Sequence, residues 1–232
     1  MQEDNGVNKE DWMQRRWVGV VVACLCGLAL VGGVSRWAEE STAAAGIRYV
    51  SVRRGCGGQQ PCYRSIQEAV DVSQTGDEIR IAAGTYTDVH VRPRRDVTAT
   101  GSVTQVVYLE KGVTLRGGYS ADFGVWDPEQ YPTTLDAQQQ GRVVYITGAI
   151  SPVIEGLRLV HGRAEGSSGE IGGGLYAITA AVTLRNATVY SNYATYGGGI
   201  GIEQGKAMLS ANEIIDNLGV EGIGAYLLET EA

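Results

Sequence analysis

A glycine-rich unit that recurs every 25 residues constrains the fold of this 232-residue chain more than any other feature. Val182–Asn192 matches Ala207–Asn217 position by position, and an earlier copy, Pro152–Gly162, lies 30 residues upstream of the first of these. A glycine triplet precedes each of the two later copies. The triplets are Gly172, Gly173 and Gly174, then Gly197, Gly198 and Gly199. Self-similarity at a fixed period is the signature of a repeat architecture.

Each unit contains short β-rich stretches separated by glycine or asparagine. No apolar stripe with the helical period of 3.6 residues runs through it, and each glycine inside a helix would cost about 1 kcal/mol. About three short strands in 25 residues are typical of one coil of a parallel β-helix. We therefore predict an all-β solenoid in which successive coils stack strand on strand.

Stacked coils bring equivalent residues of the repeat to about 4.8 Å from each other. We therefore expect Asn192 and Asn217 to form a ladder at a tight bend, where asparagine tolerates left-handed backbone. The glycine triplets predict a second bend, which requires positive φ or close backbone approach.

The segment before the repeats fits the same architecture. Ile47–Val52 and Glu78–Ala82 are predicted strands, and Gly84–Tyr86 is a predicted bend. Ser65–Asp71 predicts a short amphipathic helix with Ile66, Ala69 and Val70 on one face. Because the open end of a solenoid exposes apolar strands, this helix is expected to cap it.

The first 46 residues predict export. Residues 17–34 carry no charge and are long enough to cross a bilayer as a helix, after a cytoplasmic segment 1–16 that ends in two arginines. The flanks favour a retained membrane anchor over a signal peptide cleaved near Ala43–Ala45. A linker, 35–46, then precedes the domain 47–232. The chain is thus expected in the cell membrane through residues 17–34, with the repeats outside, or secreted after cleavage.

Two cysteines lie close together at the start of the exported part. Cys56 and Cys62 flank a short Gly- and Pro-containing loop, so a disulfide is predicted in an oxidising compartment. A metal pair or a reactive thiol is disfavoured, because no histidine or further cysteine is nearby.

Two stretches carry a resemblance to a known family. Tyr63–Tyr86 resembles the opening of right-handed parallel β-helix proteins of the pectin-lyase-like superfamily. Val113–Ala137 and the glycine repeats resemble its bacterial surface branch, which includes polymorphic outer membrane proteins. The chain departs from that branch because it lacks the Phe of the Phe-x-x-Asn repeat, with Tyr190 and Ile215 in the corresponding segments. The resemblance implies a right-handed parallel β-helix and leaves function open.

Enzymes on this fold include polysaccharide lyases and glycoside hydrolases, but their signatures are missing from this sequence. The Asn-Thr-Asp, Asp-Asp and Gly-His-Gly motifs are absent, and the later acidic residues do not share one repeat position. His161 is expected to be a turn or strand residue. We predict no catalytic residue, metal ligand or cofactor. The net charge of −7 argues against a nucleic-acid partner.

Aromatic residues are the remaining candidates for ligand contact. The insertion Tyr119–Tyr131 could stack on sugars or pack over the edge of the coils, and the repeat tyrosines could form a strip or simply reflect β-propensity. The candidate ligand-stacking residues are Tyr119, Trp126, Tyr131, Tyr176 and Tyr190. From Ala164 onward the chain has 2 basic and 8 acidic residues, which disfavours polyanionic substrates.

These features together favour a structural, adhesion or glycan-contacting module at the cell surface. The alternatives are a carbohydrate-active enzyme whose active site lies in missing coils, and a degenerate remnant. Since a third coil begins at Gly222 and the sequence ends ten residues later without a polar cap, further coils are expected.

Overall fold

The computed structural model describes residues 44–53, 55–95, 101–165 and 170–229. These residues form mostly β-strands in parallel sheets, together with one α-helix, α1 (Ile66–Val72), and one 3-10 turn, η1 (Cys56–Gly58). The predicted cytoplasmic segment 1–16 and the predicted membrane or signal segment 17–34 lie outside the described residues. Within the described part of the chain, no helix is long and apolar enough to span a bilayer.

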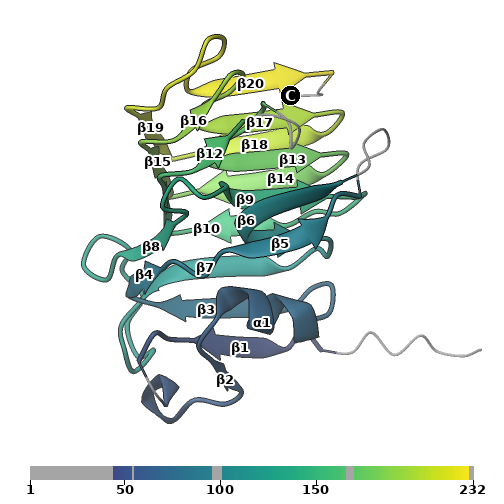
Figure 1. The fold of residues 1–232 in the computed structure, drawn as a ribbon. Coiled ribbons are helices and arrows are strands. Elements are labelled where there is room, and N and C mark those ends of the chain that lie inside the picture. Colours follow the sequence, from purple (N-terminus) through teal and green to yellow (C-terminus); the bar gives the residue numbers. More distant parts are fainter. Residues whose placement is uncertain (1–43, 54, 96–100, 166–169, 230–232) are drawn as a thin grey trace, which may run out of the picture. The chain divides into compact units, whose positions relative to one another are not determined.

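Three sheets contain nearly all of the strands (Figure 1). The first is β18 (Lys206–Ser210), β14 (Ala181–Arg185), β10 (Val153–Glu155), β7 (Thr114–Tyr119), β3 (Glu78–Ala82), β1 (Ile47–Val50) and β2 (Cys62–Tyr63). The second is β19 (Glu213–Ile215), β15 (Thr188–Tyr190), β11 (Leu157–Val160), β8 (Thr133–Asp136) and β4 (Gly84–Tyr86). The third is β20 (Ala225–Leu228), β17 (Ile200–Glu203), β13 (Leu175–Ile178), β9 (Arg142–Thr147), β6 (Ser102–Leu109) and β5 (His90–Pro93). A short pair, β12 (Arg163–Ala164) and β16 (Tyr193–Ala194), completes the set.

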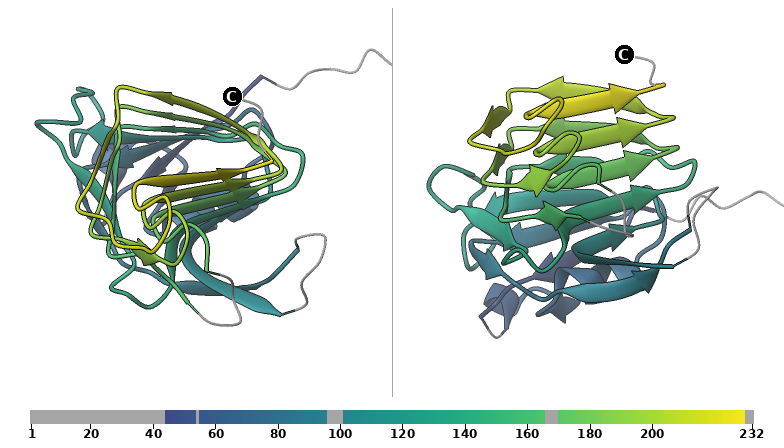
Figure 2. Two further views of the ribbon diagram at one scale, coloured as in Figure 1. Left: turned by 90° about the horizontal axis from the view of Figure 1, so that it is seen from above. Right: turned by 45° about the horizontal axis from the view of Figure 1, so that its top comes forward.

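The chain visits the sheets in turn, and each pass lies beside the previous one (Figure 2). In the later passes the paired residues are 25 positions apart, as in Leu184 with Leu209 and Val189 with Ile214. The earlier pairing of Ile154 with Leu184 has the predicted shift of 30. The register expected from the repeat is therefore confirmed. The exception to parallel pairing among the named strands is β5 with β6, which run antiparallel.

Single residues in left-handed conformation turn the chain between the sheets. The same corner recurs in each of the later passes, so these residues form columns across the strands. Between the first and second sheets they are Gly156, Asn186 and Ala211; after the second sheet they are His161, Ser191 and Asp216; between the third and first sheets they are Thr179, Gln204 and Glu229. Gly172, Gly197 and Gly222 provide a fourth corner, with φ of 56° to 65°, which agrees with the positive φ predicted for the glycine bend.

The core lies between the three sheets. Each sheet supplies rows of inward-facing aliphatic side chains, of which Leu115, Ile154 and Leu184 in the first sheet are fully buried. Burial of one such side chain is worth about 1.5–3 kcal/mol, so the stacked rows are the main source of stability.

Helix α1 begins and ends within one residue of the predicted range, and its predicted apolar face is buried against the core. It packs against β1, β3 and β6. Its Gln67 side chain completes the hydrogen bonding of β6, because Gln67 accepts from the Tyr108 backbone N–H at 2.7 Å and donates to the Tyr108 carbonyl at 3.2 Å. The side chain thus pairs with the backbone as a neighbouring strand would.

Candidate functional site

The insertion between β7 and β8 divides into two halves with different roles. In the first half, Phe123 is buried and packs edge-on against Tyr49, with ring centres 5.0 Å apart. Tyr119 is also buried, 5.8 Å from the Phe123 ring. Two roles were predicted for this insertion, sugar stacking and packing over the edge of the sheets. Its first half packs over the edge of the sheets.

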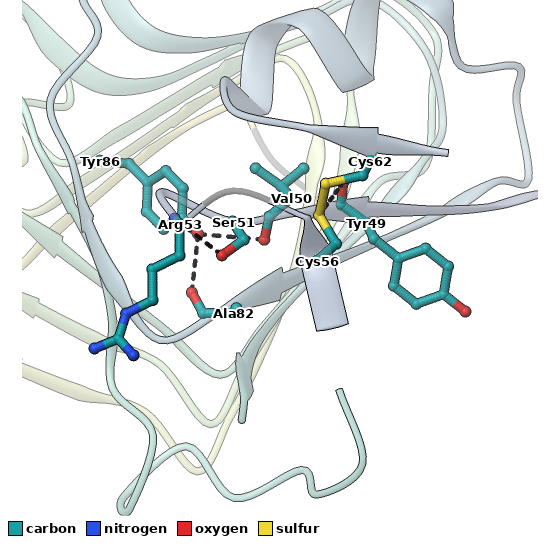
Figure 3. The surroundings of a disulfide bond; sticks show 8 residues. All are labelled: Tyr49, Val50, Ser51, Arg53, Cys56, Cys62, Ala82 and Tyr86. Atoms are coloured by element: carbon teal, nitrogen blue, oxygen red, sulfur yellow. Dashed lines mark hydrogen bonds between the residues drawn. A yellow bond between two sulfur atoms is a disulfide. The ribbon is translucent and has the colours of Figure 1, made fainter. Parts of the chain in front are cut away.

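The first half of the insertion rests on the disulfide loop. Cys56 and Cys62 are bonded, with the sulfurs 2.06 Å apart (Figure 3). Gly57 lies in this loop, and a Cβ on it would come within 2.5 Å of the Asp122 Cα atom. The disulfide loop and the insertion are thus in direct backbone contact, which requires glycine at position 57.

The second half of the insertion holds Trp126 at the surface. The indole Nε1–H donates to the Gly117 carbonyl at 2.8 Å, and the Asp127 backbone N–H donates to the Gly118 carbonyl at 2.8 Å. The Trp126 side chain remains 38% exposed. Its ring is therefore fixed in orientation and still accessible.

Arg116 covers one face of the Trp126 ring. Its guanidinium carbon lies 4.7 Å from the ring centre, within the range of a cation–π contact. The Arg116 Nε–H also donates to the Glu155 carboxylate at 2.8 Å, and an Arg185 N–H donates to the same carboxylate at 3.1 Å. Burial lowers the pKa of Arg116, but the charge of Glu155 outweighs this effect and holds the pKa above its ordinary value.

A groove with a volume of about 690 Å³ lies beside the exposed part of Trp126. We call it the Trp126 groove. Trp126, Asp127, Pro128 and Glu129 form one wall. The floor is formed where three passes of the chain enter the second sheet; its residues are Gly156, Leu157 and Arg158, then Asn186, Ala187 and Thr188, then Ala211 and Glu213. Of these, Arg158, Thr188 and Glu213 face outward, whereas Leu157 and Ala187 are buried in the core.

The outward-facing residues form a column across the strands. Arg158 pairs in register with Thr188, and Thr188 pairs with Glu213. The groove therefore runs across the strands, with a cation at one end of the column and a carboxylate at the other. Within the described residues, neither side chain forms an ion pair or a hydrogen bond.

The other predicted ligand-stacking residues lie outside this groove. The prediction is wrong for Tyr119 and Tyr176, because their side chains are only 6% and 2% exposed. Tyr131 and Tyr190 are half-buried and do not line the groove. Of the five candidates, Trp126 alone combines exposure with a cavity.

Tyr176 belongs to a buried tyrosine stack on the third sheet. Tyr108 stacks on Tyr145 with ring centres 5.4 Å apart, and Tyr145 lies 5.4 Å from Tyr176. The guanidinium of Arg142 lies 5.2 Å from the Tyr176 ring centre. Burial first, and then the hydrogen bond from its hydroxyl to Glu203, raises the pKa of Tyr176 far above its ordinary value. These rings stabilise the fold rather than present a surface.

The asparagine ladder is present, but its predicted cause is wrong. The Asn192 side chain donates to the Asn217 side-chain oxygen at 3.0 Å, and both residues are buried. The left-handed residues at this corner are their neighbours Ser191 and Asp216. The asparagines point inward instead and bond the backbone of adjacent passes, for example the Gly162 N–H at 2.7 Å.

His161 lies at a left-handed corner, with its Nδ1 atom 2.9 Å from the Asp136 carboxylate. Its side chain is 44% exposed. Among the described residues, no group of three or more His, Cys, Asp or Glu is arranged to hold a metal ion.

Comparisons with protein-family models, with curated proteins and with solved structures found no match. The candidate site therefore rests on geometry alone. Arg158 and Glu213, which line it, were not predicted as site residues. The 25- and 30-residue shifts of the repeat align them with Thr188, and this alignment is the signal that could have found them.

Proposed function

We propose that this chain is an exported, surface-attached or secreted right-handed parallel β-helix protein that contacts glycans through the Trp126 groove. Support for the β-helix comes from the repeated order of the three sheets, the 25-residue register and the helix at the first strands. Support for export comes from the uncharged segment 17–34 and the cysteine pair.

The observation that carries the proposal is the exposed, rigidly held Trp126 ring at the wall of an elongated groove. Arg116 covers one face of the ring, so a ligand would stack on the other face. A sugar presents an apolar face to such a ring while its hydroxyls meet polar groups at the margin. Thr188, Asn186 and the exposed carboxylates supply polar groups along the floor and wall.

The test is the binding of the full 232-residue chain to a panel of neutral, cationic and anionic oligosaccharides. Trp126→Ala should weaken binding of any recognised glycan about tenfold or more, as expected for loss of an aromatic anchor. Tyr193→Ala is the matched control, because that ring also lies beneath a guanidinium, that of Arg163, but outside the groove. The proposal is wrong if no glycan binds, or if both variants weaken binding equally.

A further inference from the structure

The Trp126 groove is lined by charged side chains of both signs. Elsewhere Arg48, Arg116 and Arg185 form ion pairs with carboxylates. Within the described residues, Arg158, Glu129 and Glu213 form neither an ion pair nor a side-chain hydrogen bond. Charged groups that face an open groove without partners are available to a ligand.

In the part of the chain that the structure describes, Arg158 and Glu213 do not form an ion pair with each other. Arg158 and Glu213 are two strands apart in the second sheet, which places their backbones about 10 Å apart. Thr188 separates them. A ligand that follows the groove therefore meets a cationic end and an acidic end.

Carboxylates outnumber cations along the groove. Asp127 and Glu129 on the wall and Glu213 on the floor face the single cation Arg158. A glycan with a carboxylate on every sugar would place like charges together over most of this length. A glycan with ammonium groups would meet opposite charges at Asp127, Glu129 and Glu213, and a like charge at Arg158.

We infer that the Trp126 groove selects glycans that carry free amino groups, with an ammonium group at Glu213 and an uncharged part of the chain at Arg158. This inference rests on the proposed glycan binding at the same groove and adds the class of ligand. One sugar ring stacks on Trp126, and the chain continues across the strands toward Glu213.

The experiment compares the binding of hexamers of glucosamine, N-acetylglucosamine and galacturonate to the full chain at about pH 6. Glucosamine hexamer should bind most tightly of the three. Added salt should reduce the difference in affinity between glucosamine hexamer and the other two hexamers. Glu213→Gln should weaken the binding of glucosamine hexamer about threefold, whereas Arg158→Gln should strengthen it by a similar factor. The affinity ratio of glucosamine hexamer to N-acetylglucosamine hexamer should therefore fall for Glu213→Gln and rise for Arg158→Gln, and an unchanged urea-unfolding midpoint of each variant controls for folding.

The outcomes separate this inference from the proposed function. If a glycan binds through Trp126 but glucosamine hexamer has no advantage, or if galacturonate binds best, the amino-glycan inference is wrong and glycan binding stands. If Glu213→Gln and Arg158→Gln shift affinity in the same direction, the charge argument is also wrong. If no oligosaccharide of the panel binds, both proposals fail.

Discussion

The guanidinium of Arg116 lies over the Trp126 ring, and the buried carboxylate of Glu155 holds that guanidinium in place. Glu155 is 4% exposed and is shared with Arg185 of the next strand. The orientation of a surface ring is thus determined by an ion-pair network on the outer face of the first sheet. Such a ring gives up little conformational freedom when a ligand stacks on it.

Arg116→Gln should loosen the Trp126 ring without unfolding the chain. Loss of a cation–π contact at a partly exposed site removes about 0.5–1 kcal/mol, so the ring should become more accessible to water. In a background with Trp12, Trp17 and Trp37 replaced by Phe, Trp126 is the single tryptophan. Acrylamide quenching of its fluorescence should increase.

Arg163→Gln in the same background is the control for this measurement. It removes the equivalent contact from Tyr193 and leaves Trp126 untouched, so quenching should stay at the level of the parent. Equal quenching in the parent and in the Arg116→Gln variant would show that Arg116 does not hold the ring.

Asn192→Ala should destabilise the chain by about 1–3 kcal/mol. The side chain bonds Gly162, Leu159 and Asn217, and its removal leaves buried polar groups without partners. The measurement is the midpoint of urea unfolding of the full chain. Asn212→Ala is the matched control, because its side chain bonds Ala187 and Leu184 at a half-buried position and should cost less. Equal losses would contradict a special role for the ladder.

The repeat predicts the register because the same apolar positions recur in each pass and must face the same core. Ile154 and Leu184, which pair in register and are both fully buried, illustrate this, since a shift of one residue would move the inward-facing side chains of a strand to its outer face. Gly84–Tyr86 was predicted as a bend and is instead strand β4, whose Tyr86 ring is buried. These three residues lie outside the repeated units, so the repeat does not predict their conformation. Their pairing with β8 determines it.

The candidate site was harder to predict because contacts between passes depend on uneven spacings. Arg116 and Glu155 are 39 positions apart, whereas Glu155 and Arg185 are 30 apart, so no fixed period aligns all three. Tyr176 was a candidate ligand-stacking residue, but it is covered, as are Tyr108 and Tyr145 in the same stack. Composition does not indicate which loops lie over a sheet face.

The disulfide should stabilise the entry to the first sheet by about 2 kcal/mol, since it closes a short loop in the unfolded chain. Replacement of both Cys56 and Cys62 by Ser should therefore lower the urea midpoint. Reductant should lower the midpoint of the parent to the same value and leave the double variant unchanged. A parent that is insensitive to reductant would contradict this contribution.

Asp77 should make the chain sensitive to acid. Burial alone would raise the pKa of its carboxyl, but N–H groups of Gln74 and Gly46 and the guanidinium of Arg48 outweigh it and hold the pKa below its ordinary value. The resulting stability is complete above the unfolded-state pKa of about 3.9 and is lost as pH falls through the lower folded-state pKa. Asp77→Asn should therefore cost about 2 kcal/mol at pH ~6, by loss of charged hydrogen bonds.

Urea unfolding at pH ~6 and pH ~2 measures this effect. The difference between the parent and Asp77→Asn should shrink on acidification, because the parent carboxyl then becomes protonated. Asp122→Asn is the matched control: the pKa of that carboxyl is also lowered, by the Ser120 hydroxyl and the Gly124 N–H, but the side chain lies on the exposed part of the insertion. It should change the midpoint little at either pH. A difference for Asp77→Asn that is constant with pH would rule out the carboxylate as its source.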